Sequence, residues 1–382
     1  MFCSGGNMIA ADINRQRLLK TFIDLLGIDS PSFHEKKIGA LLAAELKKRG
    51  CRVTLQKYDK SFNLIAFKKG NDVKGLPLLL SGHMDTIEPT EGIRFSIQTD
   101  RVTSTGDTVL GADDKSALAQ ILEALAVVQE NDLSHGDLEI VFTSVEEKGL
   151  HGAKNLDFKR IRSRYGLVLD SSGSVGRLVV AAPAHITYEM RIIGKAAHAG
   201  IEPEKGISAI RVAAEVISAV PNGRIDPGTT ANIGIIKGGT ATNVVPKEVV
   251  IKGELRGHDN KTLLNTRQTI FDTARRIVKK NKAMIHISEL EEYEAFKIDP
   301  YDRFLQFTDG VMKSCRVTPS HIITGGGSDA NIFNKKGIKT INLSTGMQKV
   351  HTNEEYILLK DLYKGGLLVL KAITEFVRFS EE

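Results

Sequence analysis

The chain of 382 residues is 41% hydrophobic and 26% charged, which is typical of globular proteins and unlike disordered or fibrous chains. Its 52 basic and 46 acidic residues leave a net charge of +6. Basic and acidic residues are interleaved along the chain, so the sequence lacks the concentrated basic stripe that is typical of nucleic-acid binders. The three cysteines, Cys3, Cys51 and Cys315, form no CxxC pair, which argues against a disulfide framework and a thiolate metal site.

The N-terminus lacks the charged start and long apolar run of a signal peptide, and residues 1–7 resemble a leader before a second candidate start at Met8. The longest apolar stretches are as short as strands or are broken by charges, which argues against a membrane span. We therefore expect a cytoplasmic protein that binds neither membranes nor nucleic acids.

The first part of the chain alternates between helical and strand-like segments. Apolar residues recur at helical spacing in three segments, at about 13–27, 35–49 and 115–131. Strand-like apolar segments occupy 51–58, 63–69, 77–83, 138–144 and 165–172. Helices that alternate with short, fully apolar strands predict an α/β unit with a largely parallel sheet.

The pattern changes after Pro183. Apolar and polar residues alternate over 185–195 and 246–258, as in half-exposed antiparallel strands, and two helical stretches accompany them, at 206–220 and 261–281. The α/β pattern then returns after Pro300, with segments at 301–314, 339–344 and 355–378. The sequence therefore predicts a discontinuous α/β domain over 1–182 and 295–382, with a small α+β domain inserted at 183–294.

Polar residues follow the apolar strands, where open α/β sheets place their sites. The candidate metal ligands are His83, Asp113, Glu147, Asp170 and His351, with Asp85 placed to orient the His83 ring and Glu146 as a base without a metal. Taken one at a time, each has a structural explanation, such as a polar turn, a helix cap or a solvated loop end. Together the five candidate ligands form a nitrogen and oxygen donor set without sulfur, which suits two zinc-like ions, each with one histidine and one carboxylate, that share a third carboxylate.

The same residues carry a resemblance to a known family. The sequence contains, in order, the motifs GHMDT, GADDKSALA, EEKGLHGA, GKAAHAG, GGTATNVVP, ELRGHD, GGGSDANIF and VHTNEEYI. This series is similar to the dinuclear zinc metallopeptidases, which include peptidase T, aminoacylase, the glutamate carboxypeptidases and succinyl-diaminopimelate desuccinylase. GADDK and the short insert resemble peptidase T-like tripeptide aminopeptidases most. The resemblance implies a mixed-sheet catalytic domain that carries an inserted α+β lid and dimerisation domain.

The resemblance also implies which residues hold the metals. His83 and Asp170 match the ligands of one zinc, Glu147 and His351 match those of the second, and Asp113 matches the carboxylate that bridges them. The native ions are expected to be Zn, with Co or Mn as alternatives. The peptide bond from Asp113 to the next residue is expected to be cis.

Other matched residues have roles beside the metals. Asp85 resembles the residue that orients His83, and Glu146 resembles the general base. In the insert, His198 matches a histidine that reaches the partner subunit's active site, which implies a homodimer. Substrate contacts are expected from Asn243, Arg256 and Gly326. The remaining histidines, His185 among them, are expected to be surface or hydrogen-bonded residues.

The expected activity is hydrolysis of short peptides, with a tripeptide aminopeptidase as the first choice. An N-acyl-amino-acid amidohydrolase or a carboxypeptidase would use the same dinuclear site, because the sequence does not show which end of the substrate is recognised. A third alternative is an inactive homologue that binds peptides. The intact Glu146 and the five ligand positions argue against this alternative.

Overall fold

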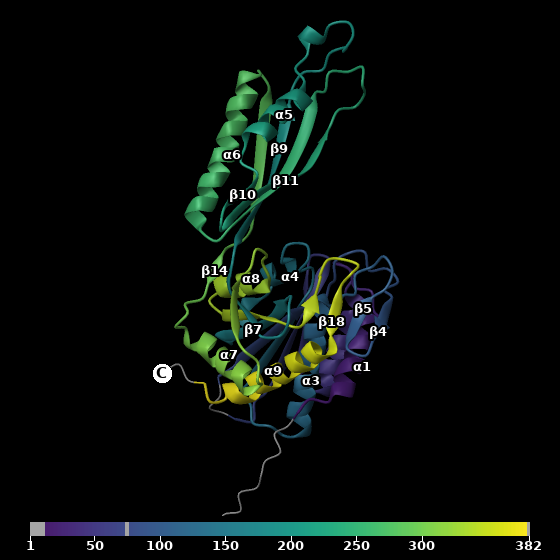
Figure 1. Cartoon of the computed structure of the whole chain (residues 1–382), viewed down its shortest axis with the longest axis vertical. Coiled ribbons are helices and arrows are strands. Elements are labelled where there is room, and N and C mark those ends of the chain that lie inside the picture. Colours follow the sequence, from purple (N-terminus) through teal and green to yellow (C-terminus); the bar gives the residue numbers. More distant parts are fainter. Residues whose placement is uncertain (1–11, 73–75, 380–382) are drawn as a thin grey trace, which may run out of the picture. The chain divides into compact units, whose positions relative to one another are not determined.

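The computed structural model of the chain describes residues 12–72 and 76–379, so Cys3, Met8 and the leader lie outside the described residues. The chain forms two compact units (Figure 1). Unit 1 consists of Met1–Val180, Ile298–Ile322 and Ser328–Glu382, and unit 2 of Ala181–Lys297 and Ile323–Gly327. The first part of unit 2 contains the whole predicted insert. Its second part is the short stretch Ile323–Gly327, which ends in three glycines.

The sheet of unit 1 is mixed. Its strands follow the order β1-β2-β6-β3-β7-β16-β8. Their bounds are Arg52–Tyr58 for β1, Ser61–Lys68 for β2, Leu78–His83 for β3, Leu138–Thr143 for β6, Tyr165–Ser171 for β7, Arg177–Ala182 for β8 and Lys339–Ser344 for β16. The central strands β6, β3, β7 and β16 are parallel, and β1, β2 and β8 are antiparallel to their neighbours. The parallel centre agrees with the run of buried apolar strands in the sequence.

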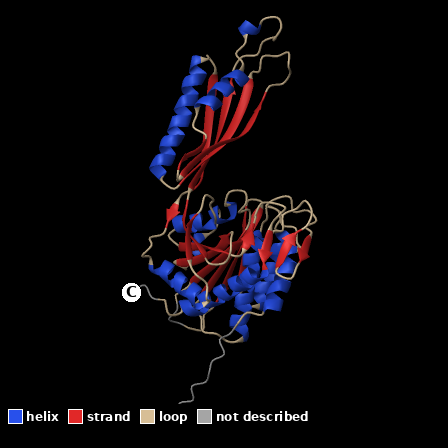
Figure 2. Cartoon of the chain, viewed as in Figure 1, coloured by secondary structure: helices blue, strands red, loops and turns tan. Residues whose placement is uncertain are grey.

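Helices cover both faces of this sheet (Figure 2). The main ones are α1 (Arg15–Leu26), α2 (Lys36–Lys48), α3 (Ala112–Glu130), α7 (Arg303–Ser314) and α9 (Leu359–Phe376), with the short α4 (His151–Lys154) and α8 (Asp329–Lys335). Phe62 of β2 touches α2, whereas the next residue, Asn63, donates to the carbonyl of Gly152 in α4. Because successive strand residues point to opposite faces, α2 and α4 lie on opposite sides of the sheet.

Helix α3 is buried almost along its whole length. It packs between the strands β3 and β7 and the helices α1 and α9. A helix that is enclosed on all sides can be apolar all round, which accounts for its run of alanine, leucine and valine. Its first turn, which carries Asp113, is thereby fixed against the end of the central sheet.

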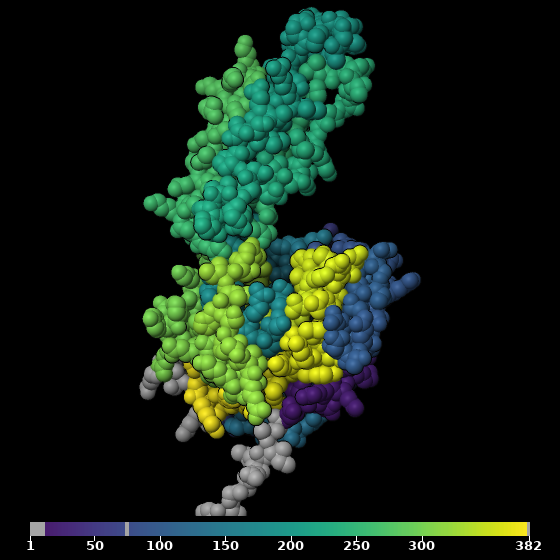
Figure 3. Space-filling model, viewed as in Figure 1, coloured from purple at the N-terminus to yellow at the C-terminus, as the bar shows by residue number. Residues whose placement is uncertain are grey.

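A small sheet in unit 1 pairs a segment from the N-terminal part of the chain with one from the C-terminal part. It has the order β17-β18-β5-β4, with β4 at Phe95–Ile97, β5 at Arg101–Ser104, β17 at Met347–Gln348 and β18 at Tyr356–Leu358. In the space-filling view the blue segment of β4 and β5 accordingly lies beside the yellow C-terminal segment (Figure 3). The loop between β17 and β18 carries His351, so this sheet fixes both ends of that loop.

Unit 2 is an antiparallel sheet with two helices on one face. The strand order is β10-β11-β12-β9-β13, with β9 at Ala184–Ile193, β10 at Gly223–Asp226, β11 at Thr229–Gly238, β12 at Glu248–Gly257 and β13 at Met284–Tyr293. Helices α5 (Ala209–Ala219) and α6 (Asn260–Lys280) pack on this sheet and share one apolar core with it. The Asp259 side chain accepts a hydrogen bond from the Thr262 N–H and so caps the start of α6. The mixed α/β unit with an α+β insert matches the predicted fold class.

Within the described ranges no helix combines the length and the apolar character needed to cross a membrane. Cys51 and Cys315 are both free and buried, and burial raises the pKa of each thiol to about 11. Neither thiol is therefore a thiolate at neutral pH.

Candidate metal centre

The candidate ligands from the central sheet gather where its parallel strands end. His83 is the last residue of β3, Asp170 lies near the end of β7, and Glu147 comes four residues after β6. The carboxyl ends of parallel strands meet at one edge of a sheet, which is where open α/β folds place their sites. The observed parallel pairing of β3 with both β6 and β7 therefore brings these three side chains to the same edge.

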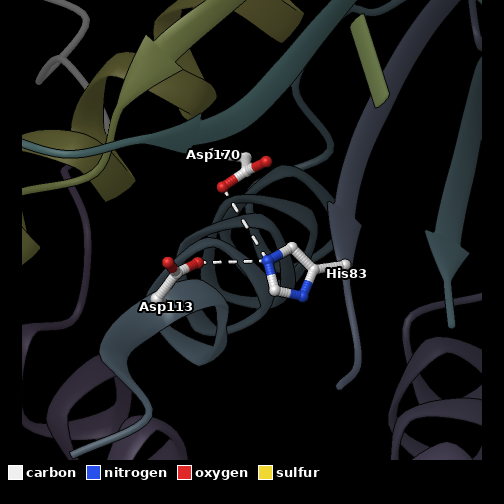
Figure 4. A group of neighbouring side chains, drawn as sticks. All are labelled: His83, Asp113 and Asp170. Atoms are coloured by element: carbon white, nitrogen blue, oxygen red, sulfur yellow. Dashed lines mark hydrogen bonds and ion pairs between the residues drawn. The ribbon is translucent and has the colours of Figure 1, made fainter. Parts of the chain in front are cut away.

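His83 faces two carboxylates (Figure 4). Its Nε2 lies 3.0 Å from Oδ1 of Asp113 and 3.8 Å from Oδ1 of Asp170. The ligating atoms of these three residues all lie within 4.8 Å of one another. His83 Nδ1 lies 2.8 Å from the backbone carbonyl oxygen of Asp85, so a proton on Nδ1 leaves the Nε2 lone pair directed at the two carboxylates. This is the tautomer that binds a metal through Nε2.

A second group shares Asp113 with the first. His351 Nε2 lies 3.2 Å from Oδ2 of Asp113 and 3.3 Å from Oε1 of Glu147. The two carboxylate oxygens of Asp113 therefore face two different histidines. The structure thus brings together all five predicted ligands, in two groups that meet at Asp113.

The backbone around Asp113 is held by the carboxylate of Glu355, a residue to which no role was assigned from the sequence. The peptide bond between Asp113 and Asp114 is cis, as predicted. The buried Glu355 accepts hydrogen bonds from the N–H groups of Leu110, Gly111 and Asp113 at 2.7–3.0 Å. Glu355 belongs to the VHTNEEYI motif, but nothing in the sequence pairs it with a segment more than 240 residues away.

Asp85 has a different geometry from the one expected. Its carboxylate oxygen lies 3.6 Å from His83 Nδ1, which is beyond a hydrogen bond, and its backbone carbonyl takes that position instead. The carboxylate accepts hydrogen bonds from the N–H groups of Glu146 and Glu147, at 2.9 and 3.2 Å, and from the Ser32 hydroxyl at 2.7 Å. Asp85 therefore fixes His83 through its backbone and the pair of glutamates through its side chain.

Glu146 is the carboxylate that faces the first group without belonging to it. Its carboxylate oxygen lies within 4.8 Å of the ligating atoms of His83 and Glu147. The preceding residue, Val145, has a φ of 56°, which is unusual for a β-branched residue and marks a tight turn at this point. Burial and the nearby charge of Asp170 raise the pKa of Glu146 well above its ordinary value. A carboxylate with a raised pKa is suited to accept and return a proton near neutral pH.

The charges of the group show that cations fit there. Contacts with Asp113 and Glu147 raise the pKa of His351 to about 10, and burial raises the pKa of Asp170 to about 7. Burial also raises the pKa of Glu147. Crowded, buried carboxylates that oppose each other's ionisation are stabilised by a divalent cation. Because the donors are oxygen and imidazole nitrogen, the set suits zinc, cobalt or manganese.

Asp329 is a further buried acid near this group. It follows the glycine run at the start of α8, and its Oδ2 accepts a hydrogen bond from the Thr143 hydroxyl at the end of β6. Its Oδ1 is buried and has no hydrogen-bond partner among the described residues, and burial raises the pKa of Asp329 to about 6. The only signal in the sequence was its position inside the GGGSDANIF motif.

The three predicted residues of the insert, His198, Asn243 and Arg256, lie in unit 2, and so does Gly326, which belongs to the short stretch Ile323–Gly327 and not to the predicted insert. The loops of His198 and Asn243 are joined by the hydrogen bond from Ala199 N–H to the Asn243 carbonyl, at 2.9 Å. Arg256 lies beside the glycine run, with Nη1 3.4 Å from the Gly325 carbonyl oxygen. The loop of His198 follows the end of β9, whereas Arg256 pairs with the start of that strand.

Zinc should stabilise the protein through these residues. At a free zinc concentration of about 100 times Kd, binding to the folded state alone adds about 2.7 kcal/mol to the free energy of unfolding. We expect zinc to raise the melting temperature of the wild type and to leave that of Asp113→Asn unchanged. The control is Asp309→Asn, which loses an aspartate–histidine contact elsewhere, to His321. Zinc should raise the melting temperature of this control as much as that of the wild type.

The rise in melting temperature that zinc causes should also depend on pH. Protons compete with metal for His351 and Asp170, whose pKa values are raised, so the zinc-induced shift should shrink as the pH falls from about 8 to about 6. An equal zinc-induced rise in melting temperature in the wild type and in Asp113→Asn would contradict zinc binding at Asp113.

Comparisons with known proteins agree with this arrangement. Residues 180–282 match the model of the peptidase dimerisation domain, and residues 63–202 match that of peptidase family M28. Aminopeptidase PepT from Bacillus cereus, whose crystal structure is known, is 37% identical in sequence to this chain. The match covers 95% of this chain and 99% of the PepT chain, with a TM-score of 0.87.

A tripeptidase from Staphylococcus aureus is 34% identical over 96% of this chain and 100% of its own, with a TM-score of 0.91. A dinuclear metal-binding M20 peptidase from Bacillus subtilis, YxeP, shares the fold at 16% identity, with a TM-score of 0.72 over 95% of this chain and 98% of its own. Because the similarity to PepT and to the tripeptidase spans nearly the whole chain, the protein belongs to the peptidase T-like family of M20 metallopeptidases.

Proposed function

We propose that the protein is an aminopeptidase that uses two divalent cations to remove the N-terminal residue of tripeptides. The observation that carries the proposal is the position of Asp113, whose two carboxylate oxygens face His83 and His351 inside one group of buried acids. The peptidase names of two relatives that align with this chain from end to end support the reaction class.

The five gathered residues are proposed to hold the two ions. His83 and Asp170 would bind one ion, Glu147 and His351 the other, and Asp113 both. Zinc is the ion that we propose, because tetrahedral sites of histidine and carboxylate are typical of it. Such ions polarise the scissile carbonyl and lower the pKa of bound water to about 7.

Glu146 is proposed as the general base. Its carboxylate would take a proton from the attacking water and pass it to the departing amine. The Asp85 carboxylate supports this role, because it binds the N–H groups of both Glu146 and Glu147 and so holds the turn from which the two side chains diverge. A base must be held within hydrogen-bond reach of the proton that it moves.

His198 is proposed to act in the partner subunit of a homodimer. The register of β9 and β12 separates the pair Arg256–His185 from the pair Glu248–Ile193 by eight residues. That distance is about 26 Å along a strand, and His198 lies beyond its far end. An extended tripeptide spans only about 10 Å. The two positions are thus separated along the sheet by more than twice the length of the peptide, which favours a site in which Arg256 and His198 come from different chains.

Mixed dimers test this proposal. A dimer of one Glu146→Gln chain and one His198→Ala chain holds one site with both native groups. Random mixing makes half of the dimers mixed, so about a quarter of the wild-type activity should return. Each variant alone, carried through the same subunit exchange, is the control. No recovery in a preparation that contains mixed dimers would contradict the role in trans.

Substrate contacts are proposed for Asn243, Arg256 and Gly326. The Arg256 guanidinium suits a free carboxylate, which it can bind through two parallel hydrogen bonds. A Cβ at Gly326 would meet only the Thr324 hydroxyl, at 4.0 Å, so this position leaves room for a substrate backbone. A free carboxylate also occurs in N-acyl-amino acids and in carboxypeptidase substrates, which therefore stay as the alternative substrates.

A substrate panel separates these activities. Zinc-loaded protein is incubated with a tripeptide, a dipeptide, the N-acetylated tripeptide and an N-acetyl amino acid, and the products are identified by mass spectrometry. The proposal predicts release of the first residue of the tripeptide and no cleavage when its amine is acetylated. Cleavage of the acylated compounds alone would overturn it in favour of an amidohydrolase. Binding of the tripeptide without turnover by the zinc-loaded protein would favour an inactive homologue.

The proposed cellular setting is the cytoplasm. The free, buried Cys51 and Cys315 support a reducing compartment. The match to the peptidase dimerisation domain supports a homodimer formed through unit 2.

A further inference from the structure

Arg256 lies in β12 on the face of the unit 2 sheet away from its helices. Its neighbour Leu255 is fully buried in the core that α5 and α6 share with the sheet. Successive strand residues point to opposite faces, so Arg256 lies on the open face together with Glu254, two residues away. About 30% of the Arg256 side chain is exposed. The guanidinium is thus accessible, yet bordered by the side chains of its own sheet.

Glu254 holds one edge of this guanidinium. Its Oε1 lies 3.1 Å from Arg256 Nε, and its Oε2 lies 3.3 Å from Nη2. The His185 ring, from the neighbouring β9, approaches Oε2 with its Nε2 at 3.0 Å. The contacts with His185 and Arg256 lower the pKa of Glu254 to about 2, so Glu254 is ionised at neutral pH.

Tyr293 and the glycine run lie at the other end of the guanidinium. Arg256 Nη1 is 3.4 Å from both the Tyr293 hydroxyl and the Gly325 carbonyl oxygen, which makes both contacts long. The Tyr293 ring packs against His185 with 5.3 Å between the ring centres. A Cβ on Gly327 would come within 2.3 Å of the Tyr293 ring, so only glycine permits this approach. The two ends of the guanidinium are thus held by one connected group of side chains.

These contacts leave a defined part of Arg256 free. A guanidinium has five N–H donors, and Glu254 occupies Nε–H and one hydrogen of Nη2. The long Nη1 contacts are weak, so the edge formed by Nη1 and Nη2 can receive a carboxylate in the two-bond geometry that arginine favours. An arginine whose other edge is fixed loses less side-chain entropy when it binds.

We propose that Glu254, held in turn by His185, is a positioning residue that presents Arg256 to the C-terminal carboxylate of the peptide and so selects substrates with a free C-terminus. This inference rests on the proposed function, and it names the part of the substrate that unit 2 recognises. Within the described part of the chain the hydrogen bonds of the Glu254 carboxylate go to Arg256 and His185, so it acts through the arginine.

The test compares a tripeptide with the same tripeptide amidated at its C-terminus. Glu254→Gln should raise KM for the free acid about tenfold, because a charged hydrogen-bond pair is replaced by a single neutral acceptor. Its kcat should stay within about twofold, and the amide should be cleaved as by the wild type. The matched control is Glu189→Gln, which removes a carboxylate from the same sheet face, where Glu189 pairs with Lys252 at 3.0 Å. This control should leave both substrates unchanged.

The outcomes separate this inference from the proposed function. A wild type that cleaves neither peptide contradicts the proposed function. The positioning role is then decided by the crystal structure of Glu254→Gln, in which we expect Arg256 to leave Tyr293 and Gly325. An Arg256 that keeps both contacts overturns the positioning role. With an active wild type, equal changes for acid and amide, or the same change in Glu189→Gln, also overturn it. Arg256→Gln should lose the preference for the free acid altogether.

Discussion

Replacing Glu146 with glutamine should lower kcat for tripeptide hydrolysis by about 10² to 10⁴, the usual contribution of a positioned general base. Glutamine keeps the size of the side chain but cannot take a proton. Glu146 is not one of the five residues proposed to hold the ions, so the variant should keep two zinc ions per chain. Steady-state kinetics together with metal analysis of the same preparation measure both effects.

A buried glutamate in the preceding strand provides the control. Glu139 in β6 is also buried, and its carboxylate accepts hydrogen bonds from the N–H groups of Arg162 and Ser163. Glu139→Gln should lower the melting temperature without changing kcat, because this carboxylate supports a loop away from the metal centre. Full activity of a zinc-loaded Glu146→Gln protein would rule out Glu146 as the base.

Asp113→Asn should remove both ions, because this residue is the only one proposed to bind both. Losing a residue that merely supports a ligand lowers metal affinity by about 10- to 100-fold, and losing a shared ligand should exceed that. We expect less than one ion per chain and loss of nearly all activity, measured by metal analysis after dialysis and by the tripeptide assay.

Two neighbouring aspartates make this prediction specific. Asp170→Asn should lower the affinity of one ion only, since among the described residues Asp170 belongs to the group of His83 and not to that of His351. Asp114 is as buried as Asp113, but its Oδ2 accepts a hydrogen bond from the backbone N–H of His83. Asp114→Asn should therefore lower stability and retain two ions per folded chain. Two ions in Asp113→Asn would contradict the shared ligand.

Much of the site in unit 1 could be predicted because the parallel strands place it. His83, Glu147 and Asp170 stand at the ends of apolar strands, and the parallel pairing of β3 with β6 and β7 brings such ends together. His351 was a candidate from the sequence as well, but no local pattern relates it to Asp113, and only the resemblance assigned the two to one ion. Their approach depends on the pairing of β18 with β5, and this pairing joins segments about 250 residues apart.

The residues that were missed act through hydrogen bonds to groups that are distant in the sequence. Glu355 binds the N–H groups ahead of Asp113, and Asp329 meets Thr143 across the end of the sheet. Hydrogen bonds of this kind leave no periodicity in the sequence. The role of Asp85 also changed in part, since its backbone rather than its side chain faces His83 Nδ1.

In unit 2 the sequence showed two of the five strands. The alternating β9 and β12 matched the predicted segments, because their inward residues are apolar and buried. The strand β11 contains glycines and a register shift between Ile233 and Ile235, which break the alternation of faces. The edge strand β13 is largely exposed, so little burial constrains its sequence.

Anomalous diffraction from a crystal of the zinc-loaded protein, recorded at the zinc absorption edge, tests the dinuclear centre most directly. We expect two peaks per chain, one bounded by His83, Asp113 and Asp170 and the other by Asp113, Glu147 and His351. A single peak, or two peaks that do not share Asp113, would contradict this expectation.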